Sequence, residues 1–225
     1  MKKFIWLGIF FLVLSVANLA NAAAVTKDSY NNYIEKAYYN NNQDFAYPVV
    51  TTLNPDAAKK INSEIRRNIQ LWIEDINRRG GEEVKAFEIS YEVPCNHNGG
   101  ILSIIFRQYV MIDRAAHPWH IVHTLNFNSD SGDRLTVAGL SEIAKHGNDY
   151  TPAEITRRLK LYSKINNRPL YSYFKQLDKV PENFYFDDNL HVHFLFEEQT
   201  VAHYAVGIID LDADAYADIV DTASN

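Results

Sequence analysis

Hydrophobic residues recur along the chain with more than one period, and the clearest period is helical. Between residues 54 and 79 the apolar side chains return every three or four positions, at Ile61, Ile65, Ile69, Trp72 and Ile76. This spacing is typical of a helix with one apolar face. Asn54 can cap the helix start, Pro55 suits the first helical position, and Gly80-Gly81 can end it. The pattern predicts one long amphipathic helix that must pack on another element.

Most of the remaining chain shows the two-residue alternation or the short apolar runs of β-strands. We predict a hairpin from residues 83–93 and 101–112, joined by an Asn- and Gly-rich turn at 96–100. Residues 104–106 are all apolar, which indicates a central strand covered on both faces. Further strands are expected at 119–128, 134–137, 184–186, 190–196 and 205–211.

Two segments complete the predicted architecture. Residues 25–53 read as extended chain around an asparagine-rich turn at 40–44. Residues 138–177 read as helical, with a capping box at 151–154 and room for a second helix at 170–177. Consecutive hairpins with a few helices predict an α+β fold, mainly antiparallel sheet with helices packed on it.

The first residues predict export rather than part of the fold. Lys2 and Lys3 precede an apolar run of 14 residues, 4–17, whereas a helix that spans a bilayer needs roughly 20. Ala20-Asn21-Ala22 matches the small-residue pattern of signal peptidase sites. We expect a signal peptide at 1–22, release to the periplasm or outside the cell, and no stable membrane span after cleavage. An uncleaved anchor is the alternative.

Composition describes an ordinary globular chain of 225 residues, 47% apolar and 22% charged. Loss of residues 1–22 would leave 20 basic against 28 acidic residues, which changes the net charge from −6 to −8. A sequence pI of about 5.7 argues against nucleic acid as a partner. We expect one α+β domain at 23–215 and an acidic tail at 216–225, with the aspartates from Asp210 onward solvated and partly frayed.

Few residues suggest catalysis. The single cysteine, Cys95, cannot form an internal disulfide, and in an exported protein it is expected to be a buried thiol. The sequence has no G-x-S-x-G, S-x-x-K or H-E-x-x-H motif. Adjacent acids such as Asp187-Asp188 face opposite ways on a strand, so they do not make a glycosidase pair by themselves. We expect no enzyme activity and no cofactor.

Two groups of histidines are the candidates for binding. His191 and His193 lie two apart on a predicted strand and share a face with Glu197, which would suit zinc if further ligands joined them. The simpler interpretation is that both face solvent, so we assign no metal. His123 should point into the core beside a polar partner, because it shares a strand face with Leu125.

The loop at 113–118 joins two strands, and loops held by rigid strands concentrate binding residues. It contains Arg114 and His117 and is followed by Trp119. We predict these three as a ligand-binding site. The alternative for His117 is a hydrogen bond that orders the loop.

Several stretches in order along residues 25–215 resemble the exported domain of RsiV-type anti-sigma factors, which also accompanies the catalytic domain of some peptidoglycan deacetylases. They are Tyr47-Pro48-Val49-Val50, Ile61-Asn62, Gly100–Ile104, Ala116-His117, Leu125-Asn126-Phe127, Ser131–Thr136, Asn183–Phe186 and Tyr204–Gly207. The resemblance implies an α+β fold without established catalytic residues, and lysozyme as a ligand. This chain departs from the family at Arg114-Ala115, in place of glycines, and at Pro118 after the histidine.

Together these features predict an exported, non-catalytic binding module of the bacterial cell envelope. The expected partner is a lysozyme-type muramidase or another envelope protein, since an acidic surface steers basic partners. Peptidoglycan or another glycan, bound through aromatic side chains, is the alternative. An envelope-polymer hydrolase or deacetylase-related protein is the third possibility.

Overall fold

The computed structural model describes residues 31–97, 99–144 and 150–217. The predicted signal peptide at 1–22 and residues 218–225 of the predicted tail lie outside these ranges. Within them the chain has an α+β fold with antiparallel sheets, as predicted. None of the helices in the described ranges combines the length and the apolar character needed to cross a membrane.

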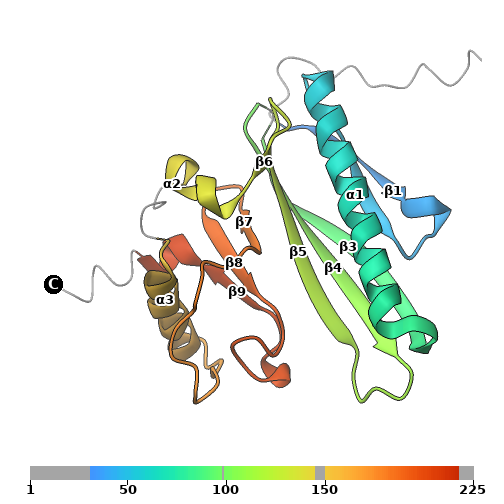
Figure 1. Ribbon diagram of the computed structural model, residues 1–225. Helices are drawn as coiled ribbons and strands as arrows, with labels where there is room; N and C mark the ends of the chain where they lie inside the picture. The colour runs from blue at the N-terminus through green and yellow to red at the C-terminus, as the bar shows by residue number, and fades with distance from the viewer. Residues whose placement is uncertain (1–30, 98, 145–149, 218–225) are drawn as a thin grey trace, which may run out of the picture.

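The largest sheet contains four antiparallel strands in the order β3-β4-β5-β6. Their bounds are β3 (Val84–Asn96), β4 (Ile101–Ile112), β5 (Trp119–Asn128) and β6 (Arg134–Leu135). Helix α1 (Pro55–Gly80) covers one face of this sheet (Figure 1). The Asn54 side chain accepts a hydrogen bond from Asp56 N and caps the helix. The predicted helix, hairpin and third strand are therefore confirmed to within a few residues.

The apolar face of α1 and the facing side chains of the sheet form the first core. Its buried members are Val50, Ile61, Ile65, Ile69, Ile89, Leu102, Ile104, Phe106, Leu125 and Phe127. A two-stranded sheet, β1 (Tyr33–Tyr38) and β2 (Ala46–Thr51), lies beside β3. It is tied there by a hydrogen bond from Ile89 N to Asp44 O, 2.7 Å long.

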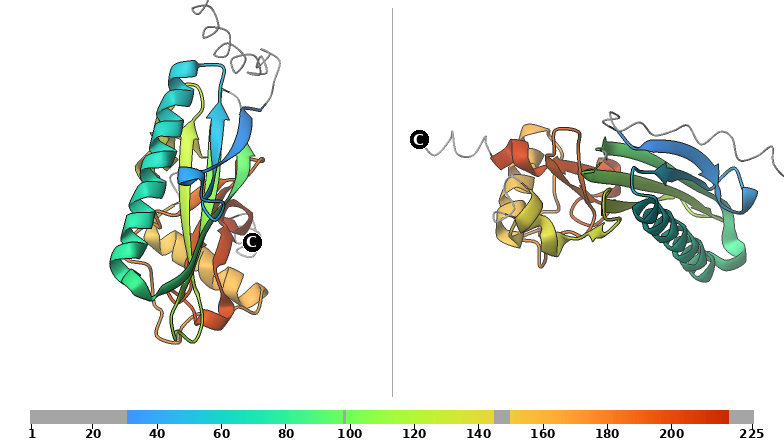
Figure 2. Two further views of the ribbon diagram at one scale, coloured as in Figure 1. Left: turned by 90° about the vertical axis from the view of Figure 1, so that its right-hand side faces the viewer. Right: turned by 90° about the horizontal axis from the view of Figure 1, so that it is seen from above.

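The C-terminal part builds a second core around a three-stranded antiparallel sheet. The strands are β7 (Phe184–Phe186), β8 (Val192–Phe196) and β9 (Ile209–Asp212). Helices α2 (Leu140–Ile143) and α3 (Pro152–Ile165) lie on the side of this sheet that is away from α1 (Figure 1). The views in Figure 2 show the two parts as an elongated molecule, with α1 and α3 near opposite ends.

The two parts meet on the face of the large sheet opposite α1, which we call the outer face. Phe186 N donates to Ser103 Oγ at 3.0 Å, and Phe184 N donates to Thr124 Oγ1 at 3.1 Å. Ile105 and Val122 of the large sheet pack on Tyr185 and Leu195 of the small one, in a third buried cluster. Strand β4 is thus covered on both sides, as its apolar run predicted.

The segment 138–177 is helical only in part, which differs from the prediction for its last residues. Besides a 3₁₀ turn at Val137–Gly139, its described helices are α2 and α3, and 170–177 is not helical. Leu170 instead forms a β-bridge with Ala202, and Tyr171 N donates to Val201 O at 2.9 Å. Likewise, the last strand starts at Ile209 rather than at 205, because a 3₁₀ turn occupies Tyr204–Val206. Long-range pairing overrides the local apolar pattern at 170–171, whereas local hydrogen bonds of the turn delay the start of the last strand.

The prediction that the aspartates from 210 onward are solvated and frayed is wrong in part for the described residues, since Asp210 is exposed but lies in a regular strand. Asp210 and Asp212 belong to β9, and Asp214 is 1% exposed. The Asp214 carboxylate accepts hydrogen bonds from the Tyr150 hydroxyl and from Val192 N. A buried carboxylate is tolerated when such donors replace its water.

Candidate functional site

The outer face carries polar side chains where the C-terminal sheet leaves it uncovered. Phe106 of β4 and Ile89 of β3 point toward α1 and belong to the first core. Because side chains alternate along a strand, their neighbours point to the outer face. These neighbours are Glu88, Ser90, Arg107, Tyr109 and His120. Glu88 and Ser90 are exposed, and the other three are partly exposed. This end of the outer face is therefore available to a ligand.

A groove of about 240 Å³ lies on this surface and reaches the segment that precedes β9. It is lined by Glu88, Ser90, Arg107, Gln108, Tyr109, His120, Ile121, Glu198 and Ile208. We call this set the outer-face groove. Strands β3, β4 and β5 supply its wall on one side, and residues between β8 and β9 supply Glu198 and Ile208. The site exists only because the two sheets are brought together.

The charges of the groove are only partly paired. His120 Nδ1 lies 3.0 Å from Glu198 Oε1, and Arg107 Nε donates to Glu92 Oε1 at 2.9 Å. Glu88 forms no ion pair with any part of the chain that the structure describes. With Arg107 engaged by Glu92 and Glu198 engaged by His120, Glu88 is the carboxylate of the described lining that is left without an ion pair, and it favours a cationic group of a ligand.

The predicted loop residue His117 lies close to this groove. Its imidazole stacks on the ring of Tyr204, with the ring centroids 3.8 Å apart, and its Nδ1 lies 3.2 Å from Pro118 O. Burial first and the nearby Glu198 carboxylate second raise the pKa of the Tyr204 hydroxyl. His117 thus has the loop-ordering contact that was the alternative interpretation, and it also extends the ring surface beside the groove.

The other two predicted residues do not converge with His117. Alternation places Trp119 on the α1 side of β5, with His123, whereas His120 faces the groove. The Arg114 side chain is 93% exposed and its Nε lies 3.8 Å from Asp113 Oδ2. The structure therefore joins His117 to Tyr204 and the groove, and leaves Arg114 and Trp119 as separate exposed positions.

Aromatic rings continue from Tyr204 along the same segment. His203, its neighbour in the chain, contacts the ring of Tyr171 at a centroid distance of 4.6 Å. Tyr171 in turn stacks on Tyr173 at 4.8 Å, with an interplanar angle of 13°. Tyr173 is 72% exposed. We call Tyr171, Tyr173, His203, Tyr204 and His117 the aromatic strip.

The histidines of β8 form a network with aspartates. His193 Nδ1 lies 2.9 Å from Asp210 Oδ1, and the Tyr185 hydroxyl donates to Asp210 Oδ2 at 2.7 Å. Burial alone would lower the pKa of His193, but the hydrogen bond and the charges of Asp210, Asp212 and Asp187 raise it. The surrounding carboxylates therefore favour the protonated form of this imidazole.

Among the residues that the structure describes, His191, His193 and Glu197 do not bring their ligand atoms together as one group. His191 Nδ1 lies 3.3 Å from Asp212 Oδ2. Glu197 follows the end of β8 at Phe196, and its Oε1 accepts a hydrogen bond from Val122 N on the large sheet at 3.4 Å. Glu197 is therefore engaged by the backbone of the large sheet, whereas His191 is engaged by Asp212.

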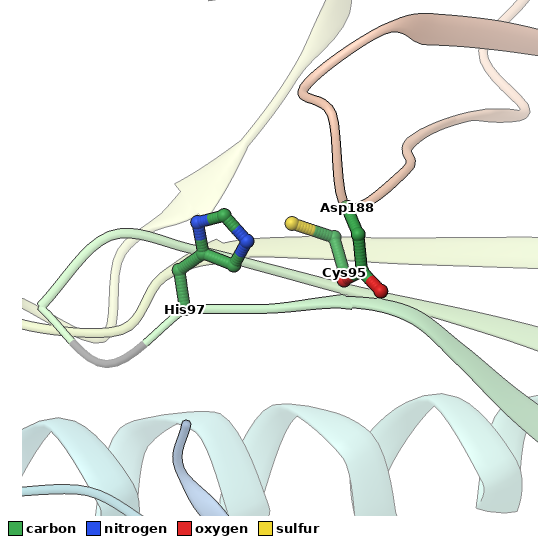
Figure 3. A group of neighbouring side chains, drawn as sticks. All are labelled: Cys95, His97 and Asp188. Atoms are coloured by element: carbon green, nitrogen blue, oxygen red, sulfur yellow. The ribbon is translucent and has the colours of Figure 1, made fainter. Parts of the chain in front are cut away.

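A different trio of potential ligands was missed by the sequence analysis. Cys95, His97 and Asp188 lie together where the end of β3 meets the β7–β8 turn (Figure 3). One signal could have found part of it, because residues two apart at a strand end share a face, as Cys95 and His97 do. The approach of Asp188 depends on tertiary structure. Cys95 is fully buried, and burial first, then the charges of Asp188 and Asp187, raises the pKa of its thiol to about 12. Such a thiol is unsuited to act as a nucleophile.

Comparison with known proteins shows the fold. No family model matches the chain, and no curated protein matches it. A DUF3298-family protein from Bacteroides fragilis has a similar structure, with a TM-score of 0.50 and 13% identity over 82% of this chain and 88% of that one. A DUF3298-family protein from Pseudomonas aeruginosa has a TM-score of 0.54 and 9% identity, over 85% and 94% of the two chains. At these identities the similarity concerns the fold alone, so the resemblance to RsiV-type proteins stays a prediction.

Proposed function

We propose that this chain is an exported, non-catalytic binding module of the bacterial cell envelope that recognises a basic protein, with a lysozyme-type muramidase as the expected partner. The observation that carries the proposal is the outer-face groove, in which Glu88 and Glu198 lie beside Tyr109. Tyrosine next to carboxylates suits an arginine or lysine side chain, through ring contact and charge together.

The size of the groove supports a macromolecular partner. Small-molecule sites usually enclose about 300–1,000 Å³ and surround most of their ligand. A groove of about 240 Å³ is smaller, and it suits one side chain that protrudes from a larger surface. Protein interfaces commonly anchor an arginine or an aromatic residue in such a depression.

Overall charge acts in the same direction. The full chain carries 28 acidic against 22 basic residues, and removal of the predicted signal peptide would remove two of the lysines. A net negative protein attracts basic partners and raises the association rate, and this attraction weakens as salt screens it. We therefore expect binding to a muramidase to be sensitive to ionic strength.

The test is a binding titration of the purified protein with lysozyme at low and moderate salt. Glu88→Gln and Glu198→Gln should each weaken binding by roughly tenfold, because each removes one carboxylate from the lining of the groove. Glu142→Gln is the matched control, since Glu142 is exposed on α2 and does not line the groove. Equal affinity for all four proteins, or no binding at either salt concentration, would refute lysozyme as the partner at this groove.

The aromatic strip favours a second candidate, a glycan such as peptidoglycan. Flat rings that follow one another along a surface can stack on successive sugars. Stacking depends little on salt, so sedimentation with insoluble peptidoglycan should persist at high ionic strength. Tyr173→Ala and His203→Ala should abolish it, while Tyr33→Ala, at an exposed tyrosine of β1, should not. If the variants of the aromatic strip sediment with peptidoglycan as well as the unmodified protein does, a glycan is excluded as the ligand of the strip.

A further inference from the structure

We propose that Cys95, His97 and Asp188 bind a zinc ion, or a metal ion of similar ligand preference, and so join the end of β3 to the β7–β8 turn. One thiol sulfur, one imidazole nitrogen and one carboxylate oxygen of these residues lie within 4.8 Å of one another. Figure 3 shows the three side chains gathered between the two parts of the fold. This site involves no residue of the outer-face groove, so a test of metal binding is independent of a test of the proposed function.

The donor set points to the class of metal. Sulfur, imidazole nitrogen and carboxylate oxygen are the ligands that zinc accepts, usually in tetrahedral geometry. Magnesium and calcium take oxygen ligands and do not select a thiolate. Three protein ligands leave a fourth position for water, and the exposure of Asp188 provides access to it.

The required movement is small. In a tetrahedral zinc site the neighbouring ligand atoms are separated by about 3.3–3.8 Å, as follows from bond lengths of about 2.0–2.3 Å. The trio must therefore contract by about 1 Å. Asp188 is exposed and His97 is partly exposed, so rotation of these two side chains can supply the movement while Cys95 stays in place.

The ligand atoms are available to a metal. Within the described ranges, the imidazole of His97 and the carboxylate of Asp188 form no hydrogen bond, and Cys95 Sγ has one long contact, 3.5 Å to Ile101 O. The neighbouring Asp187 carboxylate is used differently, because it accepts from Asn189 N and His191 N and shapes the turn. The turn is thus held by Asp187, and Asp188 is left to face Cys95.

The backbone that carries the trio is already fixed. His97 N donates to Ile101 O at 2.9 Å, and the Ser129 hydroxyl donates to His97 O at 2.7 Å. A site whose backbone is held in place loses little conformational entropy when the metal binds. The metal need only order the ends of two side chains.

Coordination of a metal would also change the ionisation of the thiol. A divalent cation deprotonates a coordinating thiol and attracts a neighbouring carboxylate. Binding of zinc should therefore release the thiol proton to solvent and become weaker at acidic pH.

Cobalt(II) titration of tag-free, reduced full-chain protein tests the proposal. We expect one equivalent of cobalt to produce a thiolate-to-metal charge-transfer absorption, which zinc then removes by displacement. Asp188→Asn and His97→Gln should each reduce the affinity at least tenfold. Asp178→Asn, at an exposed aspartate outside the trio, should leave it unchanged.

Cys95→Ser separates the ligand role from a folding role. It should remove the charge-transfer absorption in a protein whose circular dichroism is unchanged. If this variant misfolds, the cobalt affinity of Asp188→Asn, at an exposed position, provides the test of the ligand role instead. The absence of charge-transfer absorption in the unmodified protein would overturn the proposal. Unchanged affinity in Asp188→Asn and His97→Gln, or loss of binding in His191→Gln instead, would overturn it as well.

Discussion

The imidazole of His123 lies flat on the indole of Trp72, with the ring centroids 4.3 Å apart and an interplanar angle of 5°. His123 belongs to β5 and Trp72 to α1, so the stack joins the large sheet to the helix that covers it. The sequence predicted the inward direction of His123, but its expected polar partner is replaced by a ring. No hydrogen bond to this imidazole occurs within the described ranges.

This environment makes the fold sensitive to acid. Burial lowers the pKa of His123 to about 4, while Asp75 raises it slightly and Arg79 lowers it. The unfolded chain binds the proton near pH 6.5, so the unfolded state gains protons first as pH falls. The contribution of the neutral His123 to the free energy of unfolding is fully present above about pH 6.5, and it is lost progressively as pH falls to about 4. We expect the free energy of unfolding to be about 2 kcal/mol lower at pH 5 than at pH 7.5 because of His123.

Urea denaturation at pH 7.5 and pH 5 measures this loss, and His123→Phe is the variant that isolates it. Phenylalanine keeps a ring on Trp72 and cannot be protonated, so the variant should lose about 2 kcal/mol less than the unmodified protein. The difference is needed because His193 acts with the opposite sign, its pKa being raised. An equal loss in both proteins would contradict the assignment to His123.

Gly132 fits a space that admits no side chain. Its φ is +75°, and an added Cβ would lie 2.7 Å from Ala57 O and 2.8 Å from Ala57 Cα, in the first turn of α1. Gly132→Ala should therefore lower the free energy of unfolding by more than about 2 kcal/mol, through backbone strain and steric overlap together.

Gly81 provides the matched control for this substitution. It also has a positive φ, +51°, but an added Cβ would meet no atom within 4 Å. Gly81→Ala should cost about 1–2 kcal/mol, from the backbone conformation alone, and less than Gly132→Ala. Equal losses in the two variants, measured by urea denaturation, would show that the contact with Ala57 is unimportant.

Asp214 is predicted to be a major determinant of stability in the C-terminal part. Removal of its buried carboxylate in Asp214→Ala would leave the Tyr150 hydroxyl and Val192 N without their acceptor. Loss of these partners in a buried site should cost about 3 kcal/mol of unfolding free energy. Asp178→Ala, at an exposed aspartate, should stay within about 0.5 kcal/mol of the unmodified protein. A similar small change in both would contradict the prediction.

Arg114 adopts a backbone conformation that favours glycine, with φ of +59° in the β4–β5 loop. Arg114→Gly should raise the free energy of unfolding by up to about 1 kcal/mol, because glycine adopts this conformation without steric cost. Arg66→Gly, at an exposed position within α1, should lower it by about 1 kcal/mol. If Arg114→Gly also weakens binding of a partner, the exposed guanidinium belongs to the interface that was predicted for this loop.

The local elements could be read from the sequence where one signal was strong. The stripe from Ile61 to Ile76, the cap at Asn54 and the glycine-rich turn after Asn96 each act over a few residues. Their physics is local, since periodicity and capping depend on neighbours in the chain. The same holds for the α+β class. The helix expected at 170–177 does not form, because the backbone at Leu170 and Tyr171 pairs with residues 201–202.

The candidate sites depended on residues that no local pattern connects. Ser103 and Thr124 looked like ordinary polar positions of strands, yet they bond the backbone of β7 and set where the two sheets meet. That junction places Glu198 beside His120, and it brings Asp188 to Cys95 and His97. The sequence by itself determined the strands, the long helix and the excess of acidic residues. Tertiary structure alone decided which side chains converge. A face-to-face contact between two sheets produces no repeating pattern in the sequence of either strand, so the sequence does not reveal it.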